Sequence, residues 1–189
     1  MKENTTRYAV LGLLSIMPCS GYDLKKLADM SVSHFWSENY GHIYPVLHAL
    51  EAEGMVATVE KEPSQTQGRP PKTVYRITEK GSLELNDWLK KPAEHHPLRN
   101  ELLLKIFLAV DLPASNVKEK LAREKEMHAE QLEGLRGIEA MLKSQEPYKS
   151  QKALPLWLAT IDMGKRFSRT VMEWCDATAR SLGERTIDS

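Results

Sequence analysis

The sequence predicts a mainly α-helical chain in two parts, a small α/β unit followed by an all-helical unit. Strand-like alternation of β-branched and aromatic residues occurs in only one place, over 55–62 and 72–78. Elsewhere, apolar residues recur at steps of three and four, the spacing of one helix face. The 189 residues are enough for one or two domains, and with 41% hydrophobic residues the chain is too apolar to be disordered.

Three helices are expected before the strands. The first covers about 5–17, because Pro18 cannot continue it, and the second begins around Ser20. The third covers about 41–53 and ends before Gly54, the usual residue after a helix C-terminus. The apolar face of this third helix consists of Ile43, Val46, Leu47 and Leu50. Its opposite face is therefore left without a partner inside this part of the chain.

The two strands form a hairpin with a long polar tip at 63–71, and a fourth helix is expected over 79–91. The segment 92–97 (PAEHHP) has the composition of a linker. We therefore place the domain boundaries at 1–92 and 97–189. The helical patterns beyond the linker cover 98–110, 114–143 and 152–182.

Three helices followed by a two-stranded hairpin is the element order of a winged helix-turn-helix. The chain is thus expected to be an N-terminal winged helix-turn-helix, with three helices and a two-stranded β-wing, followed by an all-helical dimerisation domain. In this fold the exposed face of the third helix enters a DNA major groove about 12 Å wide, and the wing reaches the neighbouring backbone or minor groove. The candidate DNA-binding residues are His42, Tyr44, Pro45, His48, Lys61, Arg69 and Lys72.

The distribution of charge agrees with this assignment. Lys+Arg and Asp+Glu each number 26, so the formal net charge is zero, which excludes a uniformly basic protein that coats nucleic acid. Between residues 61 and 80, however, five lysines and arginines stand against two glutamates. Such a local excess of positive charge is what contacts to DNA phosphates require.

Several motifs in the N-terminal part match one known pattern. Residues 41–54 (GHIYPVLHALEAEG) fit G-x-[IL]-Y-P-x-L-x-x-L-E-x-x-G. Residues 68–78 (GRPPKTVYRIT) fit G-R-P-x-K-x-x-Y-x-[IL]-T, and Gly81 follows as in T-x-x-G. AVLGLL at 9–14 and SGYDL at 20–24 match the first two helices. On these residues the chain resembles the PadR family of transcriptional regulators.

The resemblance implies a role for several of the candidate residues. Tyr44 would touch the DNA backbone or a base, Pro45 and His48 would lie along the groove, and Arg69 with Lys72 would anchor the wing. The family often has arginine or lysine on the exposed face of the third helix after Y-P, where this chain has His48. Base readout is therefore expected to be weaker or different here.

The C-terminal part also resembles PadR proteins. Residues 98–108 are similar to the start of the helical domain in the longer PadR subfamily, which includes AphA-type virulence activators. Relatives in this family dimerise through the helical domain, and some respond to small aromatic or drug-like ligands. The resemblance therefore implies a homodimer.

The last predicted helix carries a heptad-like stripe, in which residues recur at steps of three and four. It consists of Leu154, Trp157, Ile161, Gly164, Ser168, Val171, Cys175, Thr178 and Leu182. In the preceding helix, Leu121, His128, Leu135 and Leu142 recur every seven residues.

Two uses of this stripe stay open. It can form a dimer interface, in which the small residues Gly164 and Ser168 let two helices approach closely, or it can line a pocket for a small aromatic effector between Trp157, Phe167 and Trp174. The candidate residues for the interface or pocket are Trp157, Ile161, Gly164, Phe167, Ser168, Val171 and Trp174.

Nothing in the sequence indicates an enzyme. The motifs GxSxG, GxxxxGK[ST], HExxH and GxGxxG are absent, so we expect no catalytic residues and no cofactor. The adjacent His95 and His96 have no third ligand nearby, so no metal site is expected. Cys19 and Cys175 are far apart and are expected to be free thiols in a reducing cytoplasm. No apolar run approaches the roughly 18–20 residues that span a bilayer.

The sequence thus predicts a cytoplasmic, sequence-specific regulator of transcription. We expect a ligand- or stress-responsive repressor that binds double-stranded DNA as a homodimer on a palindromic operator. The alternative is a helical protein-interaction adaptor that uses a winged-helix scaffold without binding DNA. A gel shift with the DNA upstream of the chain's own gene distinguishes the two.

Overall fold

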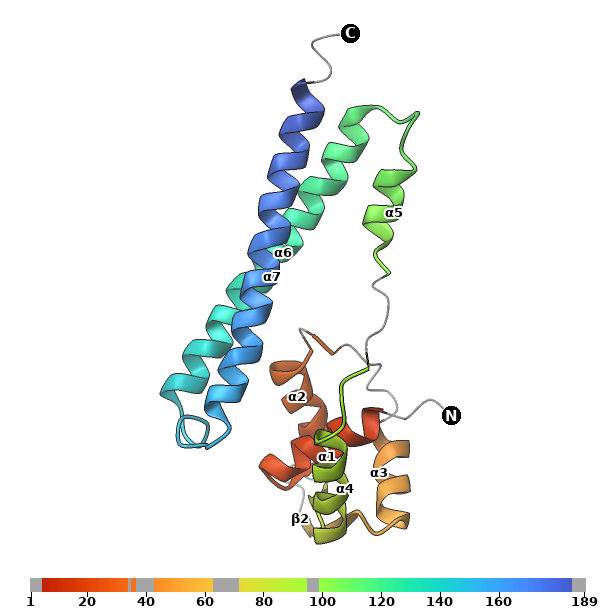
Figure 1. The fold of residues 1–189 in the computed structure, drawn as a ribbon. Coiled ribbons are helices and arrows are strands. Elements are labelled where there is room, and N and C mark those ends of the chain that lie inside the picture. The colour runs from red at the N-terminus through yellow and green to blue at the C-terminus, as the bar shows by residue number, and fades with distance from the viewer. Residues whose placement is uncertain (1–4, 34, 37–42, 63–71, 95–98, 185–189) are drawn as a thin grey trace. The chain divides into compact units, whose positions relative to one another are not determined.

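The computed structural model describes residues 5–33, 35–36, 43–62, 72–94 and 99–184, and it is mainly helical (Figure 1). The chain divides into two compact units, Met1–His95 and His96–Ser189. In the described residues the elements follow in the order α1 (Thr5–Ile16), β1 (Cys19–Ser20), α2 (Gly21–Ser31), α3 (Ile43–Ala52), β2 (Val56–Glu62), β3 (Lys72–Ile77), α4 (Glu79–Leu89), α5 (Glu101–Phe107), α6 (Ala114–Ser144) and α7 (Leu154–Glu184).

The first unit is a winged helix-turn-helix, as the sequence predicts. Its core forms around α1, which contacts α2, α3, α4 and β3. Among the side chains of this core that are almost completely removed from solvent are Val10, Leu11, Leu24, Ile43, Leu47, Leu50 and Val56. Since α1 carries apolar residues on nearly its whole circumference, it is the helix that the others can cover.

The sheet contains one strand more than the predicted hairpin. Strands β2 and β3 pair antiparallel, and the two-residue strand β1 pairs with β3, so the order is β1-β3-β2. The register of the hairpin shifts between Thr58 and Glu60, where one extra residue on β2 forms a bulge. The edge of β3 that faces away from β2 is thus occupied by the segment between α1 and α2.

A compact junction joins the end of α3 to the start of α4. Gly54, with φ of 73°, follows α3 and adopts the left-handed conformation that ends many helices. Thr78 caps α4 by accepting a hydrogen bond from the backbone N–H of Gly81 at 3.1 Å, and its hydroxyl donates to the carbonyl of Gly54 at 2.8 Å. A Cβ atom at Gly81 would collide with the carbonyl oxygen of Met55. The spacing of Thr78 and Gly81 therefore reflects a cap and a close backbone approach.

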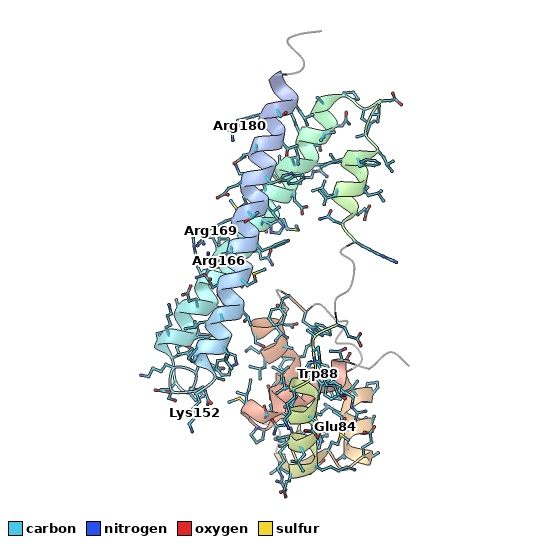
Figure 2. The ribbon with its side chains drawn as sticks, in the orientation of Figure 1. Glu84, Trp88, Lys152, Arg166, Arg169 and Arg180 are labelled. Atoms are coloured by element: carbon cyan, nitrogen blue, oxygen red, sulfur yellow. The ribbon has the colours of Figure 1, made fainter. Side chains whose placement is uncertain are left out.

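Helix α4 is held against α1 by an aromatic pair. The rings of Tyr8 and Trp88 stack with centroids 4.6 Å apart and planes 7° from parallel. The Tyr8 hydroxyl also donates to Glu84 Oε1 at 3.2 Å. Glu84 and Trp88 lie one turn apart on α4, which brings both to the same side of that helix (Figure 2).

In the second unit, α6 and α7 run antiparallel and pack along their lengths (Figure 1). Their apolar contacts form two separate clusters. One is centred on Val117, Leu121 and Cys175, with Ile106 of α5 against it, and the other on Leu135, Leu142 and Ile161. The predicted recurrence every seven residues on α6 is confirmed, since Leu121, His128, Leu135 and Leu142 are all buried.

Polar groups occupy the middle of the helix pair. His128 Nδ1 lies 3.4 Å from the hydroxyl oxygen of the fully buried Ser168, and Ser168 donates to Gln131 Oε1 at 3.3 Å. Two ion pairs also join the helices: Lys125 of α6 with Asp176 of α7, at 2.7 Å, and Glu139 of α6 with Lys165 of α7. The two apolar clusters are thus linked by a polar segment.

Three further findings concern the part of the chain that the structure describes. No helix there is long and apolar enough to cross a membrane. No group of three or more His, Cys, Asp or Glu side chains there is arranged to hold a metal ion. Cys19 and Cys175 are both buried and are not joined in a disulfide, and burial raises the pKa of the Cys175 thiol above its usual value.

Candidate nucleic-acid interface

Helix α3 has two chemically different faces. The buried face consists of Ile43, Leu47 and Leu50. The exposed face consists of Tyr44, Pro45, His48 and Ala49. Pro45 falls in the first turn, where backbone N–H groups have no partner within the helix, so the proline costs no hydrogen bond. An aromatic and polar surface is thereby left uncovered along the helix, as the sequence predicts.

The exposed face of α3 borders a hollow of about 340 Å³ on the surface of the first unit. It lies where the start of α2, the first turns of α3 and strand β3 meet. The residues that line it are Ser20, Gly21, Tyr22, Tyr44, His48, Thr73 and Tyr75. Six of these seven residues carry a hydroxyl or imidazole group, and such groups can donate hydrogen bonds to phosphate oxygens or base edges.

The short strand β1 fixes one wall of this hollow. It pairs Cys19 with Tyr75 and Ser20 with Val74, which ties the segment before α2 to strand β3. Ser20 then caps α2, because its hydroxyl oxygen accepts from the backbone N–H of Asp23 at 3.2 Å. The same hydroxyl donates to Asp23 Oδ2 at 2.8 Å. The first residues of α2 are thus held in a defined position relative to β3.

The two strands of the wing carry basic residues. In the β2–β3 ladder, Lys61 is paired with Thr73 and Lys72 with Glu62, so both lysines lie toward the end of the hairpin that leads to the tip. Arg76, further along β3, has an exposed side chain. Basic residues near the tip suit the electrostatic attraction between a wing and the DNA backbone.

The electrostatic setting of Tyr75 differs from that of an exposed tyrosine. This side chain is buried, and burial raises the pKa of its hydroxyl above the usual value. The nearby Glu51 carboxylate and Tyr44 add smaller contributions in the same direction. The Tyr75 hydroxyl is accordingly protonated at physiological pH.

The structure brings together some of the predicted DNA-binding residues. Tyr44 and His48 line the same hollow, and Pro45 lies exposed beside them. The predictions for His42 and Arg69 concern residues outside those that the structure describes. The described placement of Lys61 and Lys72 is that of their backbone in the wing strands.

Sequence reasoning missed the part of the hollow that α2 and β3 contribute. Gly21, Tyr22 and Thr73 were each assigned to a helix start or a strand and not to the interface. Tyr22 is 69% exposed, and Asp23, Lys25 and Lys26 follow it in α2. A large aromatic side chain directly after a Ser-Gly helix start was the available signal.

In the helical unit, the predicted stripe of α7 is largely covered within one chain. Ile161 and Ser168 are buried against α6 within this chain, and their part in a dimer interface or a pocket stays a prediction. Gly164 is half-buried. Phe167 is exposed and meets the ring of His128 edge-on, with centroids 5.6 Å apart.

The aromatic residues proposed for an effector pocket are not brought together within the chain. Trp157 packs in the cluster of Leu135, whereas Trp174, like Val171, packs in the cluster of Leu121. A rise of about 1.5 Å per residue places the two tryptophans about 25 Å apart along α7. One small molecule cannot contact both within a single chain.

Comparison with known proteins identifies relatives of both units. Residues 10–87 match the Transcriptional regulator PadR-like family, and residues 98–183 match the Virulence activator alpha C-term family. The chain is 30% identical over 147 residues to the negative transcriptional regulator PadR of Bacillus subtilis. That match covers 75% of this chain and 77% of the relative.

Solved structures share the fold of this chain. The crystal structure of Bacillus subtilis PadR in complex with operator DNA is similar with a TM-score of 0.81 and 23% identity, over 96% of this chain and 99% of that chain. The same protein in complex with p-coumaric acid gives a TM-score of 0.74 and 22% identity, over 95% and 99%. The virulence activator AphA of Vibrio cholerae gives 0.72 and 23%, over 95% and 98%. From its sequence motifs, its winged helix-turn-helix and these relatives, the chain belongs to the PadR family of transcriptional regulators.

Proposed function

We propose that this PadR-family regulator represses transcription by binding a palindromic operator as a homodimer. The observation that carries the proposal is the division of α3 into a buried apolar face and an exposed face that borders the hollow. Tyr44 and His48 lie on this exposed face and in the lining of the hollow, and both carry groups that can bond to a base or a phosphate. The name of the Bacillus subtilis relative, a negative transcriptional regulator, supports repression.

Selection from a random pool of DNA duplexes tests the DNA-binding part. We expect the selected duplexes to converge on a palindrome, because a symmetric dimer presents two equivalent recognition helices about 34–36 Å apart. The affinity for the selected duplex should fall steeply with salt, with a log–log slope of about −0.9 for each phosphate neutralised. A pool that yields no enriched sequence would favour a protein-interaction adaptor instead.

Two single variants separate phosphate contacts from base readout. Arg69→Ala should weaken binding to all duplexes and reduce the salt slope. His48→Ala should reduce discrimination between the selected duplex and single-base variants of it, by about 1–3 kcal/mol if His48 reads a base edge. Ser181→Ala, at an exposed position of α7, serves as the control that should leave both properties unchanged.

The helical unit supports the dimer part of the proposal. Several large apolar side chains stay exposed on α5 and in the turn after it, where Phe107 is 79% and Val110 86% exposed. A second apolar row on α7 consists of Leu156, Met163 and Phe167, all of them exposed and spaced by seven and four residues. Exposed apolar surface of this extent is typical of a protein–protein interface. A second copy of the chain fits it, because a palindromic operator requires two recognition helices.

Sedimentation tests the dimer. At low micromolar concentration the particle should have about twice the chain mass of 21.5 kDa. Phe107→Asp should shift the equilibrium from dimer to monomer, because burying a charge in an interface costs free energy. Leu83→Asp introduces the same change at an exposed leucine of α4 and should leave the dimer intact. A monomeric wild-type protein would overturn this part of the proposal.

A response to a small aromatic effector completes the proposal, supported by the complex of Bacillus subtilis PadR with p-coumaric acid. Since Trp157 and Trp174 lie in different clusters of one chain, an effector would have to contact them one at a time or across the dimer. An effector should quench tryptophan fluorescence and release DNA over the same concentration range. If no member of a panel of phenolic acids does both, this part of the proposal fails.

A further inference from the structure

We infer that Gly21 positions the Tyr44 ring for contact with DNA, by leaving free the space that this ring occupies at the start of α2. The inference rests on the proposed DNA-binding function and assigns a role in it to a residue that cannot itself read a base. Gly21 and Tyr44 both line the hollow, but they lie on different helices. The start of α2 and the first turn of α3 therefore shape this surface together.

The distances show how closely the two residues approach each other. A Cβ atom built on Gly21 would lie 2.7 Å from Cε1, 2.9 Å from Cζ and 3.2 Å from the hydroxyl oxygen of Tyr44. Carbon atoms in van der Waals contact are about 3.5–4.0 Å apart. Any side chain at Gly21 would therefore displace the end of the Tyr44 ring.

The backbone gives no other reason for glycine at this position. Gly21 is the first residue of α2, and in the described part of the chain Gly54 is the only residue with a positive φ. At Gly12 of α1 and Gly134 of α6, a Cβ atom would meet nothing within 4 Å, so close packing is not common to the helical glycines. At Gly21 the missing side chain provides space and not conformational freedom.

The same contact determines where the Tyr44 hydroxyl lies. Tyr44 belongs to the first turn of α3, and its side chain is 52% exposed, although the hydroxyl end of the ring lies against Gly21 of α2. Gly21 itself is held by the pairing of Ser20 with Val74 of β3 and by the Ser20 cap. A continuous series of contacts thus runs from β3 through α2 to the ring of Tyr44.

Replacement of Gly21 by alanine should move the ring without unfolding the protein. The end of a tyrosine side chain is free to rotate outward, so the core around α1 does not have to shift. We expect Gly21→Ala to change the melting temperature little. It should weaken binding to the selected duplex about tenfold, because the loss of one hydrogen bond to a base or phosphate has an effect of about this size. Gly12→Ala, the matched control, adds the same methyl group in open space and should leave DNA affinity unchanged.

A double-mutant cycle decides whether Gly21 acts through Tyr44. In a Tyr44→Ala background, Gly21→Ala should have no further effect on DNA affinity, since there is no ring left to displace. In a Tyr44→Phe background Gly21→Ala should also have little effect on DNA affinity, because the hydroxyl that makes the hydrogen bond is already absent. If Gly21→Ala weakens binding equally in all backgrounds, or in none, the inference is overturned.

A measurement without DNA separates this inference from the proposed function. The ring signals of Tyr44, assigned in an NMR spectrum by their loss in Tyr44→Phe, should shift in Gly21→Ala and stay unchanged in Gly12→Ala. Should Gly21→Ala lower the melting temperature, Tyr44→Ala in the same chain should restore it. Wild-type protein that binds no duplex would refute the proposed function, whereas an unshifted ring signal would refute the positioning role alone.

Discussion

The two units of this regulator bury their side chains in different ways. In the winged helix-turn-helix one continuous cluster surrounds α1, and it includes residues of every helix in the unit together with β2 and β3. In the helical unit, α6 and α7 bury two separate clusters, with His128 and Ser168 between them. In a continuous core the effect of a substitution spreads over many elements, whereas in a divided core it stays within one cluster.

The largest effect is expected in the continuous core. Leu11→Ala removes a fully buried side chain of α1 and should lower the free energy of unfolding by about 2–5 kcal/mol, because the cavity cannot be refilled. Hydrogen exchange measured by mass spectrometry should speed up in α1, α3 and α4 together. Leu83→Ala, at a leucine that is 61% exposed, is the control. Faster hydrogen exchange in α1 alone would contradict a continuous core.

A somewhat smaller loss is expected from Gly81→Ala. The added methyl group collides with the backbone carbonyl of Met55, and backbone yields less easily than the end of a side chain. Overpacking of this kind costs about 1–3 kcal/mol, which thermal unfolding can measure. Gly134→Ala adds a methyl group in open space and should be neutral or stabilising. An unchanged melting temperature in Gly81→Ala would show that the junction between α3 and α4 can open.

The centre of the helical pair should tolerate the loss of its histidine. His128→Leu removes a polar contact of 3.4 Å, while Ser168 keeps Gln131 as its acceptor. A leucine would extend apolar packing between the two clusters, so we expect the free energy of unfolding to change by less than about 1.5 kcal/mol. Chemical denaturation followed by circular dichroism measures this. If His128→Leu lowers the free energy of unfolding as much as Leu11→Ala does, the polar centre stabilises the helix pair.

The smallest effect concerns acid pH. Hydrogen bonds from Lys143 and Lys165 lower the pKa of Glu139 to about 2. A carboxyl group with a lowered pKa in the folded state adds stability above its unfolded pKa of about 4.5, and this is lost as the pH falls toward 2. Glu139→Gln should remove that part of the pH dependence, on the order of 1 kcal/mol or less because the site is partly exposed to solvent.

Urea unfolding of wild type and Glu139→Gln at several pH values between neutral and acidic tests this expectation. Glu133→Gln, which removes an exposed carboxylate paired with Arg136 on the same helix, is the matched control. The difference between wild type and Glu139→Gln should shrink below pH 4.5, whereas Glu133→Gln should follow wild type. If the free energies of unfolding of wild type and Glu139→Gln differ by the same amount at every pH, the prediction is wrong.

The sequence allowed the element order of both units to be predicted, because each signal is local. Gly54 ends α3 with a positive φ, and the steps of three and four correctly assigned Ile43, Leu47 and Leu50 to the buried face. The start of α5 was predicted three residues too early. Asn100 ends the preceding segment by capping α5 through a hydrogen bond from the Leu103 N–H at 2.9 Å.

Other features were beyond sequence reasoning for physical reasons. Strand β1 has two residues, too few for alternation to appear, and it exists only because β3 offers a free edge. The hollow arises from three segments that meet in space and share no pattern in sequence. For Ile161 and Ser168, periodicity identifies an apolar face of α7 but cannot tell whether α6 or a second chain covers it.

The two-residue strand β1 has a consequence for attempts to redirect this protein to new operators. Transfer of α3 alone into another scaffold would separate Tyr44 from Gly21 and from the edge of β3 that holds Gly21 in place. The smallest exchangeable cassette therefore runs from Cys19 to Ile77, so that it contains the whole β1–β3 pairing. Libraries that vary the exposed face of α3 should keep Gly21 constant, so that the start of α2 leaves the same space for each new side chain.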